Sequence, residues 1–172
     1  GYFGQLQMGF RGRFYVQTGM RADRNSSFGS AVPAMYLPKA GASWVVSEEQ
    51  FFKDRFPQIG MLRLRAAYGV TGRAPLAGSA LKTFAPAPSA QTGTNQPGLD
   101  LLNPGNPNLK PERGSELEGG IDASFLKDRL GVELTYFKKV TNDLILQRQL
   151  PATNGYSSNP YVNVGSVENS GI

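Results

Sequence analysis

Apolar and polar residues alternate with a period of two in six segments of the chain. This period is typical of β-strands that present one apolar and one polar face. The segments are Tyr2–Phe10, Arg13–Arg21, Lys39–Ser47, Met61–Thr71, Glu116–Phe125 and Leu130–Lys139. A seventh strand is expected to begin near Tyr161. The sequence therefore predicts an all-β fold of about seven antiparallel strands.

The two parities of these segments differ in polarity. One parity presents uncharged residues, namely Tyr2, Leu6, Met8, Phe10, Phe14, Val16, Met20, Ala40, Ala42, Trp44, Val46, Leu62, Leu64, Ala66, Tyr68, Val70, Leu117, Ile121, Ala123, Phe125, Leu130, Val132, Leu134 and Tyr136. The other parity carries Arg13, Arg21, Lys39, Arg63, Arg65, Glu116, Glu118, Asp122, Glu133 and Lys139. Such a division fits a soluble antiparallel sheet, and it also fits a membrane barrel with lipid outside and water inside.

The lengths of the strands and of their connections favour the membrane barrel. Strands of soluble proteins usually have ~5–6 residues, whereas strands that cross a membrane need ~9–11. Short connections, at Arg11-Gly12, Glu48–Gly60 and Lys127–Arg129, alternate with long ones at Arg24–Ala34, Arg73–Lys110 and Asp143–Asn159. Outer-membrane barrels have short periplasmic turns and long outer loops. We therefore expect the short connections, with one helical turn near Glu48–Phe52, to face the periplasm.

The composition removes most catalytic chemistry. The chain has no Cys and no His, so it lacks a thiolate nucleophile, a Ser-His-Asp triad, a His metal site and a disulfide. The net charge is +5, but the basic residues are dispersed and no run is longer than Lys138-Lys139, which does not favour a nucleic-acid partner. We expect neither an enzyme nor a cofactor or metal site.

About seven strands are too few to close a wide barrel. An open strand edge in lipid leaves backbone N–H and C=O groups without partners, at several kcal/mol each. The sequence also begins and ends inside apparent strands, at Gly1-Tyr2-Phe3 and Gly171-Ile172. We therefore expect residues 1–172 to be part of a longer barrel.

Several motifs, in order along nearly the whole chain, resemble those of SusC/RagA-type TonB-dependent outer-membrane transporters. Arg21–Gly29 is similar to their R-x-D-x-S-S-x-F-G signature, and Leu62–Gly72 to an L-K-L-R-x-S-Y-G-x-T-G strand. Asn106–Glu112 is similar to the N-P-x-L-K-x-E motif of the wider TonB-dependent group, although Pro111 stands where SusC-type members usually carry Trp. Further matches follow at Asp128–Leu130, Tyr136-Phe137, Thr141–Leu144, Leu150–Gly155 and Asn163–Ile172.

The resemblance implies a part of a β-barrel of about 22 strands in the bacterial outer membrane. The family's plug domain, its TonB-contacting segment and its closing C-terminal strands have no counterpart in residues 1–172. It also implies import of a bulky nutrient, most often a glycan or a peptide, with outer-membrane lipid, a TonB complex and a SusD-like lipoprotein as partners. Two alternatives remain, a soluble or surface β-sheet binding module and a passive porin-like barrel.

Charged residues on the polar parity are the candidate contacts with substrate or plug: Arg63, Arg65, Glu116, Glu118 and Asp122. The alternative for all five is a salt-bridge network within the barrel wall, since charged pairs on neighbouring strands stabilise a sheet. Glu116 and Glu118 would lie ~6.6 Å apart along one strand, a separation found in inverting glycosidases. Alternating charges on any wet face produce the same spacing, so this pair predicts no enzyme.

A second group of residues is expected to be structural. It comprises Asn106, Pro107, Leu109, Lys110 and Glu112, because the prolines of this motif suit an extended entry into a strand. Trp44 and Tyr68 could stack on sugars, but their parity places them among the residues that face lipid, where aromatic side chains anchor a protein at the membrane surface. The Pro75–Pro107 loop could contact substrate or a lid, or could be disordered surface cover.

Overall fold

The computed structural model describes residues 1–29, 31, 34–89, 96–151, 153 and 158–172. In chain order its elements are β1 (Tyr2–Phe10), β2 (Phe14–Asp23), β3 (Met35–Val45), the 3-10 helix η1 (Val46–Glu48), α1 (Gln50–Arg55), β4 (Ile59–Arg73), β5 (Thr83–Ser89), β6 (Gln96–Asn103), β7 (Glu112–Phe125), β8 (Leu130–Asn142), β9 (Ile145–Gln147), β10 (Tyr161–Asn163) and β11 (Ser166–Gly171). The predicted all-β, antiparallel fold is confirmed.

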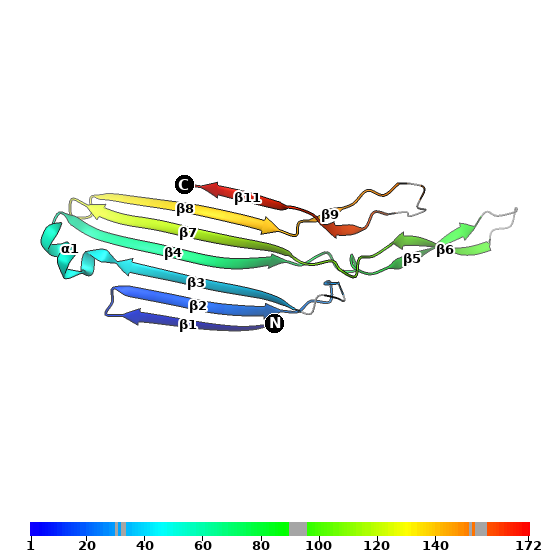
Figure 1. Ribbon diagram of the computed structural model, residues 1–172, viewed down its shortest axis with the longest axis horizontal. Helices are drawn as coiled ribbons and strands as arrows, with labels where there is room; N and C mark the ends of the chain where they lie inside the picture. Colours follow the sequence, from blue (N-terminus) through cyan, green and yellow to red (C-terminus); the bar gives the residue numbers. More distant parts are fainter. Residues whose placement is uncertain (30, 32–33, 90–95, 152, 154–157) are drawn as a thin grey trace.

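Seven strands form one antiparallel sheet in the order β1-β2-β3-β4-β7-β8-β11. Within the described residues the sheet does not close, since β1 and β11 lie at its two edges. All three short connections lie at one end of the sheet, which we call the turn end (Figure 1). The long connections, with the separate hairpins β5–β6 and β9–β10, lie at the opposite end, the loop end (Figure 1).

The six predicted strands are present, and five of them extend further toward the loop end than alternation alone predicted, with β2 continuing to Asp23. Strand β3 begins at Met35, β4 continues to Arg73, β7 begins at Glu112 and β8 continues to Asn142. At the turn end β3 stops at Val45, two residues before the predicted end, because the chain enters η1 and α1. The short turn at Arg11 and Gly12 has φ values of 51° and 69°, as the tight turns between antiparallel strands require.

The prediction for the seventh strand is wrong in position. Tyr161–Asn163 pairs with Ile145–Gln147 in the small β9–β10 hairpin, and the main sheet resumes only at Ser166, which pairs with Asn142. The backbone explains the detour, since Asp143 (φ 57°) and Gly165 (φ 67°) turn the chain out of the sheet and back into it.

The longest connection was predicted without secondary structure, yet it contains the β5–β6 hairpin. Its two strands pair from Thr83 opposite Asn103 to Ser89 opposite Gln96. Pro86 lies in β5, and a proline argues against a central strand although it is tolerated at a sheet edge. Parts of all three predicted outer loops (residues 30, 32–33, 90–95, 152 and 154–157) lie outside the described residues.

Strand register places the apolar parity on one side of the sheet. A single row of paired residues contains Phe10, Phe14, Trp44, Leu64, Ile121 and Leu134. These side chains are not covered: Phe10 is 64% exposed, Ile121 44% and Leu134 52%. We call this side the outward face and the opposite one the inward face. Lys138, two residues beyond Tyr136, also lies on the outward face, because it pairs with Leu117.

The buried apolar residues lie at the two ends of the sheet and not on either face. Phe28, Met35 and Leu109 are buried at the loop end, and Val46 and Phe52 at the turn end. Leu109 is the only fully buried side chain among the described residues. An antiparallel sheet of a soluble protein normally packs its apolar face against a core. Here no described element covers that face.

Candidate functional site

The inward face carries an ion-pair network that spans three neighbouring strands. Arg63 and Arg65 of β4 both contact Asp122 of β7: Arg63 Nη2 lies 2.6 Å from Asp122 Oδ2, and Arg65 Nε lies 3.2 Å from Asp122 Oδ1. Arg65 Nη2 reaches on to β8, where it lies 2.7 Å from Glu133 Oε1 and donates to Thr135 Oγ1 at 2.6 Å. The side chain of Asp122 is 10% exposed.

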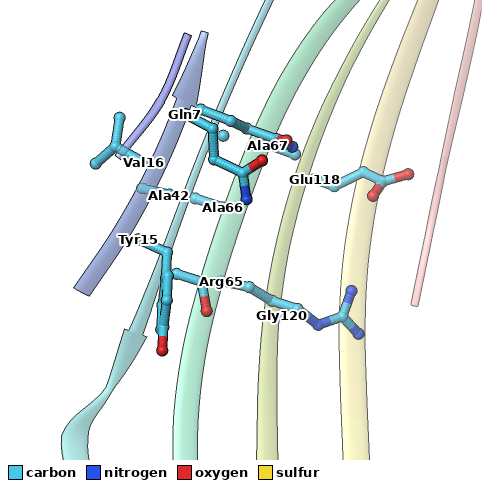
Figure 2. A pocket seen from close by; sticks show the side chains of 12 residues that line it. Gln7, Tyr15, Val16, Ala42, Arg65, Ala66, Ala67, Glu118 and Gly120 are labelled. Carbon is cyan, nitrogen blue, oxygen red and sulfur yellow. The ribbon is translucent and has the colours of Figure 1, made fainter. Parts of the chain in front are cut away.

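Local sequence explains how Arg65 reaches a strand that is not its neighbour. Its partner in the register is Gly120, and Gly120 pairs in turn with Thr135. A Cβ built on Gly120 would lie 2.8 Å from Arg65 Cζ. The missing side chain therefore leaves the space through which the arginine crosses β7, as Figure 2 shows.

The two glutamates of the predicted site differ in their surroundings. Glu116 Oε2 lies 3.5 Å from Lys139 Nζ on β8. Glu118 also points inward over β8 (Figure 2), but no ion pair of Glu118 is found within the described part of the chain. The structure thus brings Arg63, Arg65 and Asp122 together, places Glu116 in a separate pair, and leaves the Glu118 carboxylate available.

A hollow of about 200 Å³ lies on the inward face beside Glu118. Small residues form its floor, with Gly41 and Ala67 paired across β3 and β4. Polar side chains surround it, and those shown in Figure 2 include Gln7, Tyr15, Arg65 and Glu118. Amide, hydroxyl and charged groups around an open hollow can exchange hydrogen bonds with a polar ligand or with another polar protein surface.

The predicted structural motif lies at the loop end, at the centre of what we call the outer-loop cluster (residues 25–29, 31, 105–112, 143–145 and 161–164). Leu109 is fully buried, and its carbonyl accepts from the Gly29 N–H at 3.0 Å. The Pro107 carbonyl accepts from the Ala31 N–H at 3.3 Å. Asn106 Nδ2 donates to the Tyr161 carbonyl at 2.9 Å.

The remaining motif residues bind the chain after β8. Both backbone groups of Lys110 contact the amide of Asn163: the Lys110 N–H donates to Oδ1, and Nδ2 donates to the Lys110 carbonyl, each at 2.8 Å. Asn163 Nδ2 also donates to the Asp143 carbonyl at 2.8 Å. Glu112 Oε1 accepts from the Ile145 N–H at 2.9 Å. One seven-residue motif therefore joins three loops that are distant in sequence.

Trp44, near the turn end, and Tyr68, nearer the loop end, were predicted to face lipid, and both belong to the outward parity. Trp44 Nε1 donates to Glu49 Oε1 at 3.3 Å, and Glu49 Oε2 lies 3.0 Å from Arg13 Nη1. An indole whose ring is outward and whose N–H reaches a polar group suits a membrane surface.

Sequence reasoning did not single out Glu133, Thr135, Glu49 or Asn163 as functional residues. The first two could have been found by aligning the predicted strands through the β7–β8 turn, which fixes their register against Asp122 and Gly120. Glu49 and Asn163 lie in irregular segments, where a local pattern carries no information about distant partners.

The structure adds two negative observations on its described residues. No three His, Cys, Asp or Glu side chains among them are placed to hold a metal ion. No described helix is both long enough and apolar enough to cross a membrane.

Comparison with known proteins gives a consistent result along the whole chain. Residues 1–172 match the model of the family described as TonB dependent receptor-like, beta-barrel. The chain is 34% identical over 171 residues to TonB-dependent receptor P26 of Formosa agariphila, covering 99% of this chain and 17% of that protein. It is 28% identical to TonB-dependent receptor SusC of Bacteroides thetaiotaomicron, covering 99% of this chain and 17% of SusC.

Solved structures agree with the sequence matches. The RagAB peptide importer in its open-open state superposes with a TM-score of 0.84 at 25% identity, over 98% of this chain and 18% of the matched chain. The siderophore receptor PirA from Pseudomonas aeruginosa shares the fold, with a TM-score of 0.64 at 20% identity, over 98% of this chain and 29% of PirA. The chain spans about a sixth of the length of the curated relatives it matches.

Proposed function

Because the chain belongs to the TonB-dependent receptor β-barrel family, we propose that it forms a section of the wall of an outer-membrane receptor that imports a bulky nutrient. A glycan or a peptide is the substrate class we favour, since SusC and the RagAB peptide importer are among the similar proteins. Import would draw its energy from a TonB complex that acts on a plug domain within the barrel. A SusD-like lipoprotein is the partner we expect on the outer side.

One observation carries the proposal: the outward face of the sheet is apolar and uncovered, whereas the opposite face carries the charged residues and a buried ion pair. Ile121 and Leu134 are uncovered on the outward face, whereas Asp122, the neighbour of Ile121 in sequence, is buried on the inward face by two arginines. Lipid would cover the first face, and the polar interior of a barrel would accommodate the second. A soluble sheet module would leave this apolar face in water, and a passive porin would need no plug.

Two adjacent alanines of β4 test the orientation of the wall with matched changes. Ala66 belongs to the outward face and Ala67 to the inward face, opposite Glu118. In the full-length receptor, Ala66→Arg should weaken folding in lipid by about 1–3 kcal/mol, since the cost of a lipid-facing arginine is ~2–4 kcal/mol at the middle of the bilayer and ~0–1 kcal/mol near its surface. Ala67→Arg should be tolerated, since its charge lies beside a carboxylate. Heat-modifiable migration and urea unfolding in liposomes measure both. Equal effects of the two variants would contradict a lipid-facing outward side.

Glu118 is the inward residue that we propose for contact with substrate or plug, together with the hollow beside it. Arg63, Arg65, Asp122 and Glu116 already have charged partners in the wall, so we assign them a supporting role. Glu118→Gln in the full-length receptor should reduce TonB-dependent uptake of its nutrient, while Glu116→Gln, two residues away on the same face, should change uptake less. Unchanged uptake in Glu118→Gln, with normal assembly, would remove Glu118 from the transport path.

A further inference from the structure

The residues of the outward face change from apolar to polar along a line that runs obliquely across the strands. Along β1, β2 and β3 the face stays apolar or small to the loop end, where Tyr2 pairs with Ala22 and Ala22 with Tyr36. Along β8 and β11 it becomes polar earlier, at Lys138 and Glu168. Lys138 Nζ lies 2.8 Å from Glu168 Oε1, and both side chains are about half exposed on the outward face.

The change from apolar to polar is also found within a single row of residues that pair across neighbouring strands. Across the sheet, the row runs Leu6, Thr18, Ala40, Tyr68, Leu117, Lys138 and Ser170. It begins with an aliphatic side chain and ends with an ammonium and a hydroxyl. A charge in the hydrocarbon of a bilayer is costly, so the whole row cannot lie at one depth in the membrane.

The outward tyrosines shift in the same direction from β3 to β8. Tyr2 and Tyr36 share one row. Tyr68 lies in the row of Leu6, and Tyr136 lies in the row of Met8, through Gly119, Ala66, Ala42 and Val16. From β1 to β8 the tyrosine thus moves from residue 2 to the level of residue 8 of β1, toward the turn end. Tyrosines are enriched where the membrane meets water.

The turn end shifts in the same direction, which is an independent observation. The ladder of β1 and β2 ends at Phe10 opposite Phe14, in the row of Leu134. The ladder of β7 and β8 continues four residues further, to Phe125 opposite Leu130. Four residues at ~3.4 Å each, over the four strand spacings from β1 to β7 at ~4.8 Å each, correspond to a tilt of ~35°. Strands of membrane barrels tilt by ~35–45°.

With the same tilt, the height of the apolar band along the membrane normal can be compared with that of known outer-membrane barrels. Its outward residues run from Tyr2 to Phe10 on β1 and from Leu117 to Phe125 on β7, which is nine residues in each case by these numbers. Nine residues span ~27 Å along a strand and ~22 Å along the membrane normal at this tilt. The apolar belt of outer-membrane barrels is ~25 Å tall.

We propose that the outer boundary of the hydrocarbon layer follows the line Tyr2–Tyr36–Tyr68–Tyr136, and that the outward surface beyond it, with Arg113, Lys138 and Glu168, contacts the polar head groups of the outer leaflet. This placement rests on the proposed function, because it assumes that the outward face meets lipid. It adds a depth for each strand: β7, β8 and β11 leave the hydrocarbon several residues before their loop ends, whereas β1 and β2 leave it only at theirs.

Cysteine accessibility in the intact receptor tests the line, and residues 1–172 contribute no cysteine of their own. Thr18→Cys and Ser170→Cys lie in the same row, on opposite sides of the proposed boundary. Each is placed singly in a cysteine-free full-length background and exposed in outer membranes to a charged, water-soluble thiol reagent. Leu134→Cys, on the hydrocarbon side of Tyr136 in the same strand, is the reference, and heat-modifiable migration establishes that each variant is folded.

We expect Ser170→Cys to react about tenfold faster than Thr18→Cys or more, because a charged reagent is excluded from hydrocarbon. Thr18→Cys should react as slowly as Leu134→Cys. Equal rates at positions 18 and 170, with a slow Leu134→Cys, would overturn the oblique boundary and leave the membrane wall intact. A Leu134→Cys that reacts as fast as Ser170→Cys would instead overturn the proposed function.

Discussion

The sheet and the outer-loop cluster are stabilised by different contacts. Strands of the sheet are joined by continuous backbone ladders, such as the fourteen-residue β7 against β8, and the charges on its inward face add to these ladders. In the outer-loop cluster the only ladder between described segments is the three-residue pairing of β9 and β10, with Ile145 opposite Asn163. Its remaining contacts include side-chain hydrogen bonds of Asn106, Glu112 and Asn163, backbone hydrogen bonds of Gly29 and Ala31, and the buried side chain of Leu109.

This difference determines how far a local change should spread. A ladder distributes a loss over neighbouring strands, so damage to the sheet should lower the stability of the whole barrel. The outer-loop cluster is anchored at a few points, and segments with few buried contacts open independently of the global fold. Substitutions at Leu109 and Asn163 should therefore act locally, whereas a substitution at Asp122 should act globally.

Leu109 is where the largest effect is expected. Leu109→Ala removes a fully buried side chain, and such truncations cost about 2–5 kcal/mol. The loss should appear as faster hydrogen exchange and proteolysis in residues 25–29, 105–112 and 161–164, with little change in the unfolding of the barrel. Leu99→Ala is the control, because Leu99 is 76% exposed on the β5–β6 hairpin. If Leu109→Ala lowered the stability of the sheet as much as that of the outer-loop cluster, the two regions would be one cooperative unit.

Asp122 is the corresponding position in the sheet. Asp122→Ala leaves the guanidinium groups of Arg63 and Arg65 without their shared partner, and we expect a loss of about 2 kcal/mol because the two arginines remain partly solvated. Urea unfolding of the full-length receptor in liposomes should report the loss in the whole barrel. The matched control is Glu118→Ala, on the same strand and the same face, which should cost much less. A purely local loss in Asp122→Ala would contradict the distinction between the two regions.

How well the sequence predicted each region follows from the same difference. Period-two alternation identified the six long strands because one face of each is apolar over most of its length, as Leu130, Val132 and Leu134 illustrate. It missed the start of β7, where Arg113 places a charge on the outward parity although the ladder continues, and it ended β4 at Thr71 although Gly72 and Arg73 still pair with β7. The candidate charges on the inward face could be named in advance, but which of them pair depends on register and on the absence of a side chain at Gly120.

The outer-loop cluster was largely beyond sequence reasoning. Its motif was recognised, but the partners of Asn106, Lys110 and Glu112 come from positions more than thirty residues away along the chain. No periodicity marks Asn163 as the residue that binds both Lys110 and Asp143. The β9–β10 pairing depends on positive φ at Asp143, a conformation that asparagine and aspartate tolerate but do not dictate.

Asn163 should give a smaller, local effect. Asn163→Ala removes three hydrogen bonds at 2.8 Å that join Lys110 to Asp143, and at this partly exposed site we expect about 1–2 kcal/mol of local stability to be lost. Hydrogen exchange at the Lys110 and Ile145 amides should increase. Asn159→Ala, which removes a single hydrogen bond to the Leu150 N–H, should have about a third of that effect. If the two variants were equal, the joining role of Asn163 would be wrong.

The smallest effect is expected at the turn end, where Glu48 Oε2 lies 2.7 Å from Lys53 Nζ. The hydrogen bond and charge of Lys53 hold the pKa of Glu48 below its ordinary value. The folded state therefore binds the Glu48 proton less readily than the unfolded state does. The resulting stability is present above the ordinary pKa of the carboxyl group and is lost as pH falls through the lowered one. Because both side chains are more than half exposed, salt and solvent screen the pair. Thermal unfolding of the wild type and Glu48→Gln should differ slightly at neutral pH and converge under acid conditions, while a difference that persists in acid would mean that the charge of Glu48 is not its source.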